Sequence, residues 1–246
     1  MAKPAKKAAQ GKAVSKPVKA ATSAKSAKPA KEKGPSAAER NRFTLYGFAG
    51  STSTYTVALM LSLCRHPFSY IHISLRDGAH KLADYLVKNR YGQVPALRDG
   101  QVFLVQSAAI LMHLAETLGK FDGKTPLERA RIREWLFWQW DKLAVPVYRL
   151  RARNRGFRQF GDEVRVMYDT EAKAALAVME GELGKSEWIA GKKPTAADVG
   201  IYSVVRFCAD ANVDLAHDMS HAIGGGQLEL DGQDEFILVG DGPHAV

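Results

Sequence analysis

The stretch from Phe43 to Gly119 alternates strand-like and helix-like segments, and this order constrains the fold more than any other feature of the sequence. Short apolar runs bounded by Gly, Ser and Asp predict strands, whereas apolar residues at helical spacing predict helices. The sequence Arg98-Asp99-Gly100-Gln101 is typical of a hairpin turn. We therefore expect a βαβαββα domain built of alternating layers. The expected segments are strands at 43–46, 69–73, 94–97 and 102–105, and helices after 50–53, at 81–89 and at 108–118.

The chain from Thr125 to about Cys208 has the pattern of a helical domain. Thr125, Pro126 and Glu128 form a strong helix start, with an N-cap, a proline at the first position and a reciprocal Glu. Thr195 and Asp198 predict the same arrangement, with Asp in place of Glu, and we assign both to folding. Further helices are expected at 162–183 and 194–208. The predicted domains are a disordered Lys/Ala/Pro-rich arm at 1–41, the α/β domain at 42–120, the all-α domain at 125–208 and an atypical tail at 209–246 with strand character at 228–230 and 236–239.

The positive charge of the chain lies in its first 42 residues. They hold twelve of the 35 Lys and Arg residues and two of the 26 acidic residues, so the remaining 23 basic and 24 acidic residues nearly cancel. Sparse apolar side chains predict disorder here, and the lysines predict weak, nonspecific binding of nucleic acid through residues 1–40.

Two cysteines without a Cys/His cluster indicate no disulfide framework, no metal site and a reducing compartment. No apolar stretch approaches the ~20 residues of a membrane span.

Three segments of the α/β domain resemble one family. Residues 46–57 (YGFAGSTSTYTV) look like the first strand, active-site loop and helix start of bacterial glutathione transferases. Residues 92–97 (GQVPAL) are similar to the cis-proline loop of that family, and residues 104–110 (LVQSAAI) to its γ-glutamyl-binding turn. The resemblance implies a thioredoxin-like domain followed by an all-helical domain, glutathione as co-substrate, a homodimer and a cytoplasmic location.

Two segments are predicted to bind glutathione. Gln93, Val94 and Pro95 lie between a helix and a strand, where the residue before proline is held extended and its N–H and C=O are open to a peptide ligand. The resemblance assigns this loop to the cysteinyl part of glutathione; a rigid turn without a ligand is the alternative. Gln106 and Ser107 open the next helix, whose N-terminus favours a carboxylate. The resemblance assigns them to the γ-glutamyl end, and a role for Ser107 as an N-cap alone is the alternative.

The helix expected after Gly50 begins with a run of hydroxyl residues, and glutathione chemistry needs a hydrogen-bond donor there. A free thiol has a pKa of about 8.5, so ionisation at neutral pH requires a shift of about two units, or roughly 2.7 kcal/mol. A hydroxyl donating to the sulfur supplies about 1.5–3 kcal/mol and a helix N-terminus about 0.3–1 kcal/mol. The family's serine aligns with Ser51, which we predict as the donor, ahead of Ser53 and then Tyr46. Capping and core packing are the alternative roles of the latter two.

The acceptor substrate is expected against the helical domain. The resemblance places its first helix beside the acceptor pocket and makes Trp138 and Tyr148 the candidate contacts, with a core position as the alternative. The basic run from Arg149 to Arg158 is interpreted as a solvated face. Family members usually end in an aromatic-rich helix, whereas residues 209–246 contain three consecutive glycines. The tail therefore predicts an incomplete acceptor pocket and weakened activity.

Three functions are compatible with these features. The first is a detoxifying glutathione transferase that conjugates or reduces a hydrophobic electrophile. The second is a glutathione-dependent disulfide reductase. The third is a noncatalytic, dimeric interaction module with a polyanion-binding arm. Turnover of a chromogenic electrophile separates the first from the third, and formation of glutathione disulfide marks the second.

Overall fold

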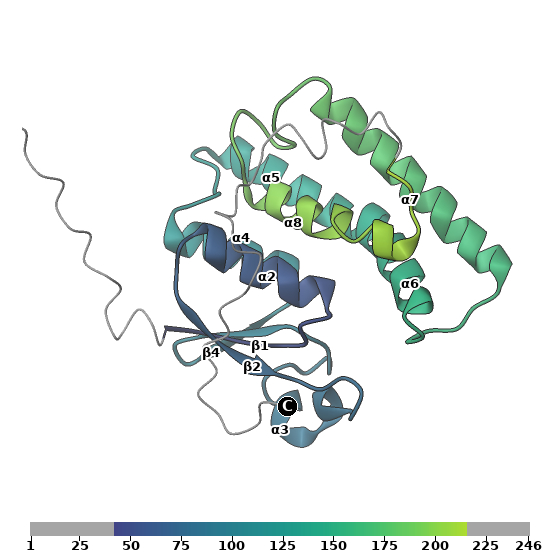
Figure 1. Cartoon of the computed structure of the whole chain (residues 1–246). Helices are drawn as coiled ribbons and strands as arrows, with labels where there is room; N and C mark the ends of the chain where they lie inside the picture. Colours follow the sequence, from purple (N-terminus) through teal and green to yellow (C-terminus); the bar gives the residue numbers. More distant parts are fainter. Residues whose placement is uncertain (1–41, 216–246) are drawn as a thin grey trace, which may run out of the picture. The chain divides into compact units, whose positions relative to one another are not determined.

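The computed structural model describes residues 42–215, in which a four-stranded sheet with helices on both faces precedes a set of packed helices (Figure 1). The strands are β1 (Phe43–Gly47), β2 (Phe68–His72), β3 (Ala96–Asp99) and β4 (Val102–Val105). Their order in the sheet is β2-β1-β3-β4. β1 runs parallel to β2, and β3 runs antiparallel to both β1 and β4. The mixed sheet with its helices and the run of helices that follows confirm the predicted thioredoxin-like domain followed by an all-helical one.

Helix α2 (Thr52–Leu63) lies at the centre of the molecule. Together with α4 (Ser107–Leu118) it covers one face of the sheet, while the short α3 (Ala83–Leu86) lies on the other side (Figure 1). Nine of the twelve α2 residues are buried, because α2 packs between β1 and α8. Its start depends on Gly47, where an added Cβ would lie 2.3 Å from Cγ2 of Thr54.

The helical domain begins with α5 (Pro126–Trp138) and continues through a π-helical turn, η2 (Gln139–Ala144), into α6 (Val145–Asn154). It then forms α7 (Asp162–Leu183), α8 (Ala196–Val205) and the short η3 (Ala209–Ala211). Both predicted capping boxes are present, at Thr125 with Glu128 and at Thr195 with Asp198. A carboxylate oxygen of Asp198 accepts from the Thr195 N–H and hydroxyl, and the other accepts from the Ile189 N–H at 2.8 Å.

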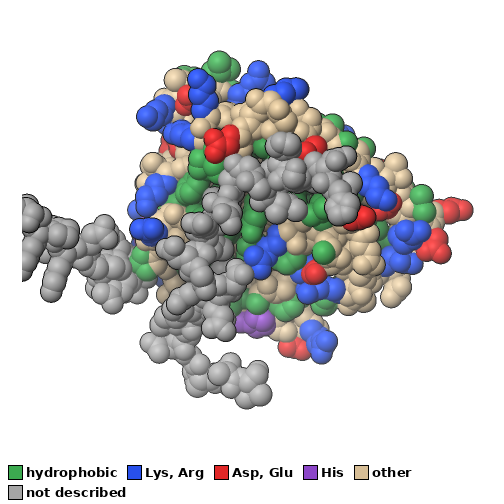
Figure 2. Space-filling view, turned by 45° about the horizontal axis from the view of Figure 1, so that its top comes forward, with side chains coloured by type: hydrophobic (Ala, Val, Ile, Leu, Met, Phe, Trp, Pro, Cys, Tyr) green, Lys and Arg blue, Asp and Glu red, His purple; other side chains and the backbone are tan. Residues whose placement is uncertain are grey.

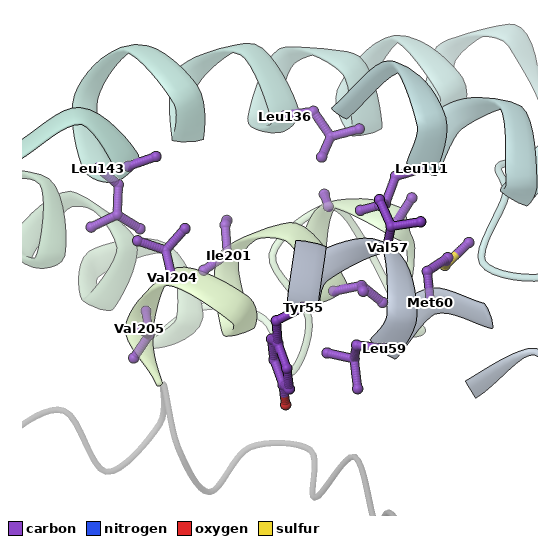
Figure 3. Packing of buried hydrophobic residues seen from close by; sticks show 14 of the residues in the cluster. Tyr55, Val57, Leu59, Met60, Leu111, Leu136, Leu143, Ile201, Val204 and Val205 are labelled. Carbon is purple, nitrogen blue, oxygen red and sulfur yellow. The ribbon is translucent and has the colours of Figure 1, made fainter. Parts of the chain in front are cut away.

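One hydrophobic core joins the two domains, as Figure 3 shows for side chains from α2, α4, α5 and α8. Leu59, Leu111 and Leu136 are at most 1% exposed. Full burial of each such side chain stabilises the fold by about 1.5–3 kcal/mol. A polar contact lies beside these residues, since Oγ1 of Thr56 on α2 and Oγ of Ser203 on α8 are 2.6 Å apart. The position of α2 is therefore set by the helical domain as well as by the sheet.

Some predicted boundaries were wrong. The helix expected at 81–89 is a 3-10 turn, η1 (Ala79–Lys81), followed by the four residues of α3, because Leu82 is extended with φ −74° and ψ 151°. β3 begins at Ala96 rather than Val94, since the two preceding residues belong to a cis Val94–Pro95 turn. α8 begins at Ala196 rather than Pro194, because Thr195 is its N-cap.

The surface of the described residues carries both signs of charge, and Figure 2 shows basic and acidic side chains interspersed on one face. Within residues 42–215, no helix combines the length and the apolar character needed to cross a bilayer. The packing continues beyond Cys208, since Ala211 and Val213 are also buried. The predicted arm at 1–41 and the strands at 228–230 and 236–239 lie outside the described residues.

Candidate functional site

A cleft of about 490 Å³ brings together eight of the nine residues predicted for the site. Its walls come from the start of α2, the loops before β3 and α4, and α6 of the helical domain. The predicted residues that line it are Ser51, Ser53, Gln93, Val94, Pro95, Gln106, Ser107 and Tyr148. The other lining residues are Leu75, His80, Lys81, Asn89, Gly92, Trp140, Val145, Arg149, Ala152, Phe157 and Arg158.

Ser51 is the N-cap of α2 and faces the cleft. Its backbone is extended, and its Oγ accepts a hydrogen bond from the Thr54 N–H at 3.3 Å. Because a hydroxyl that accepts still carries its own proton, Ser51 can donate to a group bound in the cleft. The N-terminus of α2 adds partial positive charge at the same place.

Arg151 fixes the loop that carries Ser51. Its Nη1 donates to the Gly50 carbonyl at 2.9 Å and to Oγ1 of Thr52 at 3.1 Å, and its Nε donates to Asp210 at 3.0 Å. The side chain is buried against the Phe207 ring, and this burial lowers the pKa of the Arg151 guanidinium while Asp210 raises it. The interpretation of the Arg149–Arg158 run as a solvated face is thus wrong at Arg151. No local pattern indicates this role, because its partners lie about 60 to 100 residues away along the chain.

Ser53 and Tyr46 differ in their access to the cleft. Ser53 is half-buried and lines the cleft together with Tyr148; it does not cap α2, since Ser51 does. Burial raises the pKa of the Tyr148 phenol above its ordinary value, and the Ser53 side chain opposes this shift only in part. Tyr46 is absent from the cleft wall and packs edge-on against Phe103, with ring centroids 5.8 Å apart.

The loop before β3 presents an open peptide group. The Val94–Pro95 bond is cis, and the loop is held from behind by Asn89, whose Nδ2 donates to the carbonyls of Gln93 at 2.6 Å and Pro95 at 3.2 Å. The Tyr85 hydroxyl also donates to the Gln93 carbonyl, at 2.8 Å. Within residues 42–215, neither the N–H nor the C=O of Val94 has a hydrogen-bond partner. This peptide group is therefore free to pair with an extended ligand in the cleft.

The N-cap of α4 is not Ser107, the residue considered for that position from the sequence. Ser107 is instead the first residue of the helix; Gln106 occupies the cap position with φ 69° and makes no capping hydrogen bond. A positive φ at a residue other than glycine costs about 1–3 kcal/mol and is often found at ligand sites. Ser107 is only 3% exposed, yet its hydroxyl has no partner among the described residues. Its Oγ and the first N–H groups of α4 are therefore available to an anion.

The charges that line the cleft are all positive. Lys81, Arg149 and Arg158 lie in its wall, and no Asp or Glu of the described residues does. Nζ of Lys81 donates to the Gly92 carbonyl at 2.8 Å. His80 also lines the cleft, and burial together with the nearby Lys81 lowers the pKa of its imidazole. The sequence gives no local signal that would assign these cations to one cleft.

The structure places Trp138 outside the cleft. Its ring packs against Trp135 with centroids 5.0 Å apart, and it lines a separate depression between α5 and α7. Trp140 lines the cleft instead and packs edge-on against Tyr148. Two residues separated by two positions in a helix point about 200° apart, so only one of the two tryptophans can face the cleft. The π-helical turn that starts at Gln139 also rotates the residues beyond it relative to a regular helix.

Comparisons with known proteins identify the family of the chain. The family model described as glutathione S-transferase, N-terminal domain, matches residues 41–116. A glutathione S-transferase of Silene vulgaris is 31% identical over 156 residues, or 59% of this chain and 71% of the relative. The disulfide-bond oxidoreductase YfcG of Escherichia coli is 26% identical over 69% of this chain and 82% of its own length. A glutathione S-transferase structure from Xanthobacter autotrophicus aligns with a TM-score of 0.68 at 29% identity, covering 73% of this chain and 90% of that one. The chain therefore belongs to the glutathione S-transferase family.

Proposed function

We propose that this protein is a glutathione transferase that activates the glutathione thiol for attack on, or reduction of, a hydrophobic electrophile. The observation that carries the proposal is the Ser51 hydroxyl at the N-terminus of α2, in the wall of a cleft that also contains the open Val94 peptide and the unpaired Ser107 hydroxyl. This combination offers a donor for a thiolate beside two places that can hold a peptide.

The cleft fits the chemistry of glutathione. The Val94 N–H and C=O suit its cysteinyl residue, and Gln106 and Ser107 at the start of α4 suit its γ-glutamyl carboxylate. Lys81 supplies a positive charge for the second carboxylate, that of glycine. Glutathione carries two carboxylates and one amino group, so a cleft lined by cations and by no described acid is matched to its charge.

The proposed roles follow from the geometry of α2. Ser51 donates to the sulfur and stabilises the thiolate by about 1.5–3 kcal/mol, to which the helix terminus adds about 0.3–1 kcal/mol. Together they approach the roughly 2.7 kcal/mol that an ionised thiol needs at neutral pH. Tyr148 and Trp140 form part of the wall that the acceptor contacts. We do not assign Trp138 to the acceptor site.

The proposal is tested by calorimetry with glutathione and by turnover of a chromogenic aryl halide. We expect binding together with an absorbance rise at neutral pH from the bound thiolate, and a product formed in proportion to enzyme. Binding without turnover of any electrophile or disulfide would instead support the noncatalytic dimeric module. Absence of glutathione binding would overturn the proposal.

A glutathione-dependent disulfide reductase is the second candidate, favoured by the similarity to YfcG. In this reaction one disulfide takes up two electrons and two protons, and two glutathione molecules become glutathione disulfide. Cys64 and Cys208 are buried outside the cleft, and burial raises the pKa of the Cys64 thiol to about 11. Any such reaction would therefore use glutathione sulfur alone. Formation of glutathione disulfide with hydroxyethyl disulfide as substrate would identify it.

We further propose a homodimer in the cytoplasm, with a detoxifying role. The support for association is the open edge of the sheet at β4, where Val102 is 60% exposed. The support for a reducing compartment is the presence of two cysteines, both unpaired. Sedimentation at micromolar concentration tests the dimer, and a monomer at that concentration would contradict it.

A further inference from the structure

The helical wall of the cleft carries two arginines that the glutathione contacts proposed above do not use. Arg149 lies on α6 and Arg158 follows its C-terminal end, whereas Ser51, Val94 and Ser107 all come from the thioredoxin-like domain. Val145 on α6 and Phe157 next to Arg158 give the same wall an apolar surface. The two guanidinium groups therefore lie on the side of the cleft where the acceptor is expected.

The two arginines differ from the other arginines of the same segment. Arg151 and Arg155 pair with Asp210, and Arg153 pairs with Asp162. Among the described residues, Arg149 and Arg158 have no ion-pair partner, and no acid lines the cleft beside them. The run thus divides into three arginines that are paired with Asp within the fold and two that line the cleft without an acidic partner.

We propose that the acceptor is a carboxylate-bearing electrophile whose anionic group binds Arg149 and Arg158 while its apolar body packs against Val145, Phe157 and Trp140. This inference rests on the proposed transferase function and names its substrate class. A guanidinium matches a carboxylate through two parallel hydrogen bonds, so arginine is better suited than lysine to select such a group. The apolar wall alone would accept neutral electrophiles; the two charges favour acids over neutral analogues of the same shape.

The test uses a chlorodinitrobenzoate and the matching chlorodinitrobenzamide with glutathione. In both, a carbon–sulfur bond forms at the ring carbon, the carbon–chlorine bond breaks and chloride leaves with the bonding electron pair. We expect kcat/KM to be about tenfold or more higher for the benzoate than for the benzamide, relative to their uncatalysed rates, since a charged hydrogen bond contributes about 1.5–3 kcal/mol. The preference should shrink as salt is raised.

Variants distinguish a specific contribution of Arg149 and Arg158 from a general effect of removing positive charge. Arg149→Gln and Arg158→Gln should each lower kcat/KM for the benzoate by about tenfold and leave the benzamide within about twofold. Arg131→Gln removes an exposed arginine of α5 that pairs with Glu134 outside the cleft, and should change neither. Equal turnover of the two substrates, or equal losses for both in the arginine variants, would overturn the inference while the transferase function stands.

If neither halide is turned over, the affinities of an acid and of its neutral analogue for the protein are compared instead. The probe is then dinitrobenzoate, added to protein saturated with S-methylglutathione, with dinitrobenzamide as the neutral comparison. Tighter binding of the acid that is lost in Arg149→Gln or Arg158→Gln supports the anion site. Absence of any preference for the acid overturns it.

Discussion

The Ser51 hydroxyl has two roles in the proposed site, accepting from the Thr54 N–H and donating to the bound sulfur. Ser51→Ala should therefore raise the pKa of the bound glutathione thiol by about one to two units, because the lost hydrogen bond contributes about 1.5–3 kcal/mol. Glutathione affinity should change little, since Val94, Gln106 and Ser107 hold other parts of the peptide. Ultraviolet titration of the thiolate measures the pKa, and calorimetry measures the affinity.

The same substitution removes an N-cap and should cost about 1 kcal/mol of stability, so it needs a control. Ser51→Thr keeps both the cap and the hydroxyl and should retain a lowered thiol pKa. An unchanged thiol pKa in Ser51→Ala would move the donor to Ser53, which lines the cleft. Thr52 is buried and bound by Arg151, and Tyr46 does not line the cleft, so neither is the next candidate.

Ser107 offers the reverse test, because its unpaired hydroxyl is proposed to hold the γ-glutamyl carboxylate and not the sulfur. Ser107→Ala should weaken glutathione binding about tenfold or more, as expected for a lost hydrogen bond to a charged group. The thiol of the glutathione that still binds should keep its lowered pKa. Calorimetry and thiolate titration of the same variant separate the two effects. A raised thiol pKa with unchanged affinity would contradict the assignment.

At the scale of elements, Arg151 of α6 ties the helical domain to the Gly50–Thr52 loop at the start of α2. Arg151→Met should lower the free energy of unfolding by roughly 1–3 kcal/mol through the lost hydrogen bonds. It should also raise the bound thiol pKa by part of the Ser51→Ala effect, because Ser51 is no longer held in place. Arg153→Met on the same helix removes a pair with the exposed Asp162 and should change only stability, and only slightly.

Chemical denaturation and thiolate titration provide the two readouts for this pair of variants. A loss of stability in Arg151→Met with an unchanged thiol pKa would show that the Ser51 loop is positioned without Arg151. Equal changes in thiol pKa for both variants would indicate a general charge effect.

Elements that depend on neighbouring residues were predictable from the sequence. A few adjacent residues determine the capping boxes at Thr125 and Thr195 and the hairpin at Gly100, and the structure confirms all three. The choice of Trp140 over Trp138 was not predictable, because η2 departs from regular helical geometry. The burial of Arg151 was not predictable either, because its hydrogen-bond partners are distant in sequence and no local pattern indicates them.

At the scale of the whole molecule, the two domains contribute different parts of the cleft. The thioredoxin-like domain supplies the residues proposed for glutathione, and α6 with the residues after it supplies the wall proposed for the acceptor. The contacts of α2 with α8, including the Thr56–Ser203 pair, hold these two walls together. We infer that exchange of acceptor specificity requires changes in α6 and leaves the glutathione residues intact.

The basic residues at the N-terminus lead to a prediction about polyanions. Residues 1–42 carry ten net positive charges, while the rest of the chain is close to neutral. Binding of DNA or RNA through these lysines releases counterions, so it should weaken steeply between about 50 and 200 mM salt. Deleting residues 1–40 should remove this salt-sensitive binding and leave glutathione affinity unchanged, because no residue assigned to the cleft is lost.

Fluorescence anisotropy with a short duplex, followed across salt concentrations, measures the nucleic-acid binding, and calorimetry measures glutathione affinity. A variant with four arm lysines changed to Gln should show an intermediate salt dependence, because the slope scales with the number of phosphates neutralised. Binding that persists after the deletion would contradict the prediction. The Arg149–Arg158 run is a poor substitute site, because Arg151, Arg153 and Arg155 are paired with Asp and the other two line the cleft. Persistent binding that glutathione displaces would place the polyanion in the cleft itself.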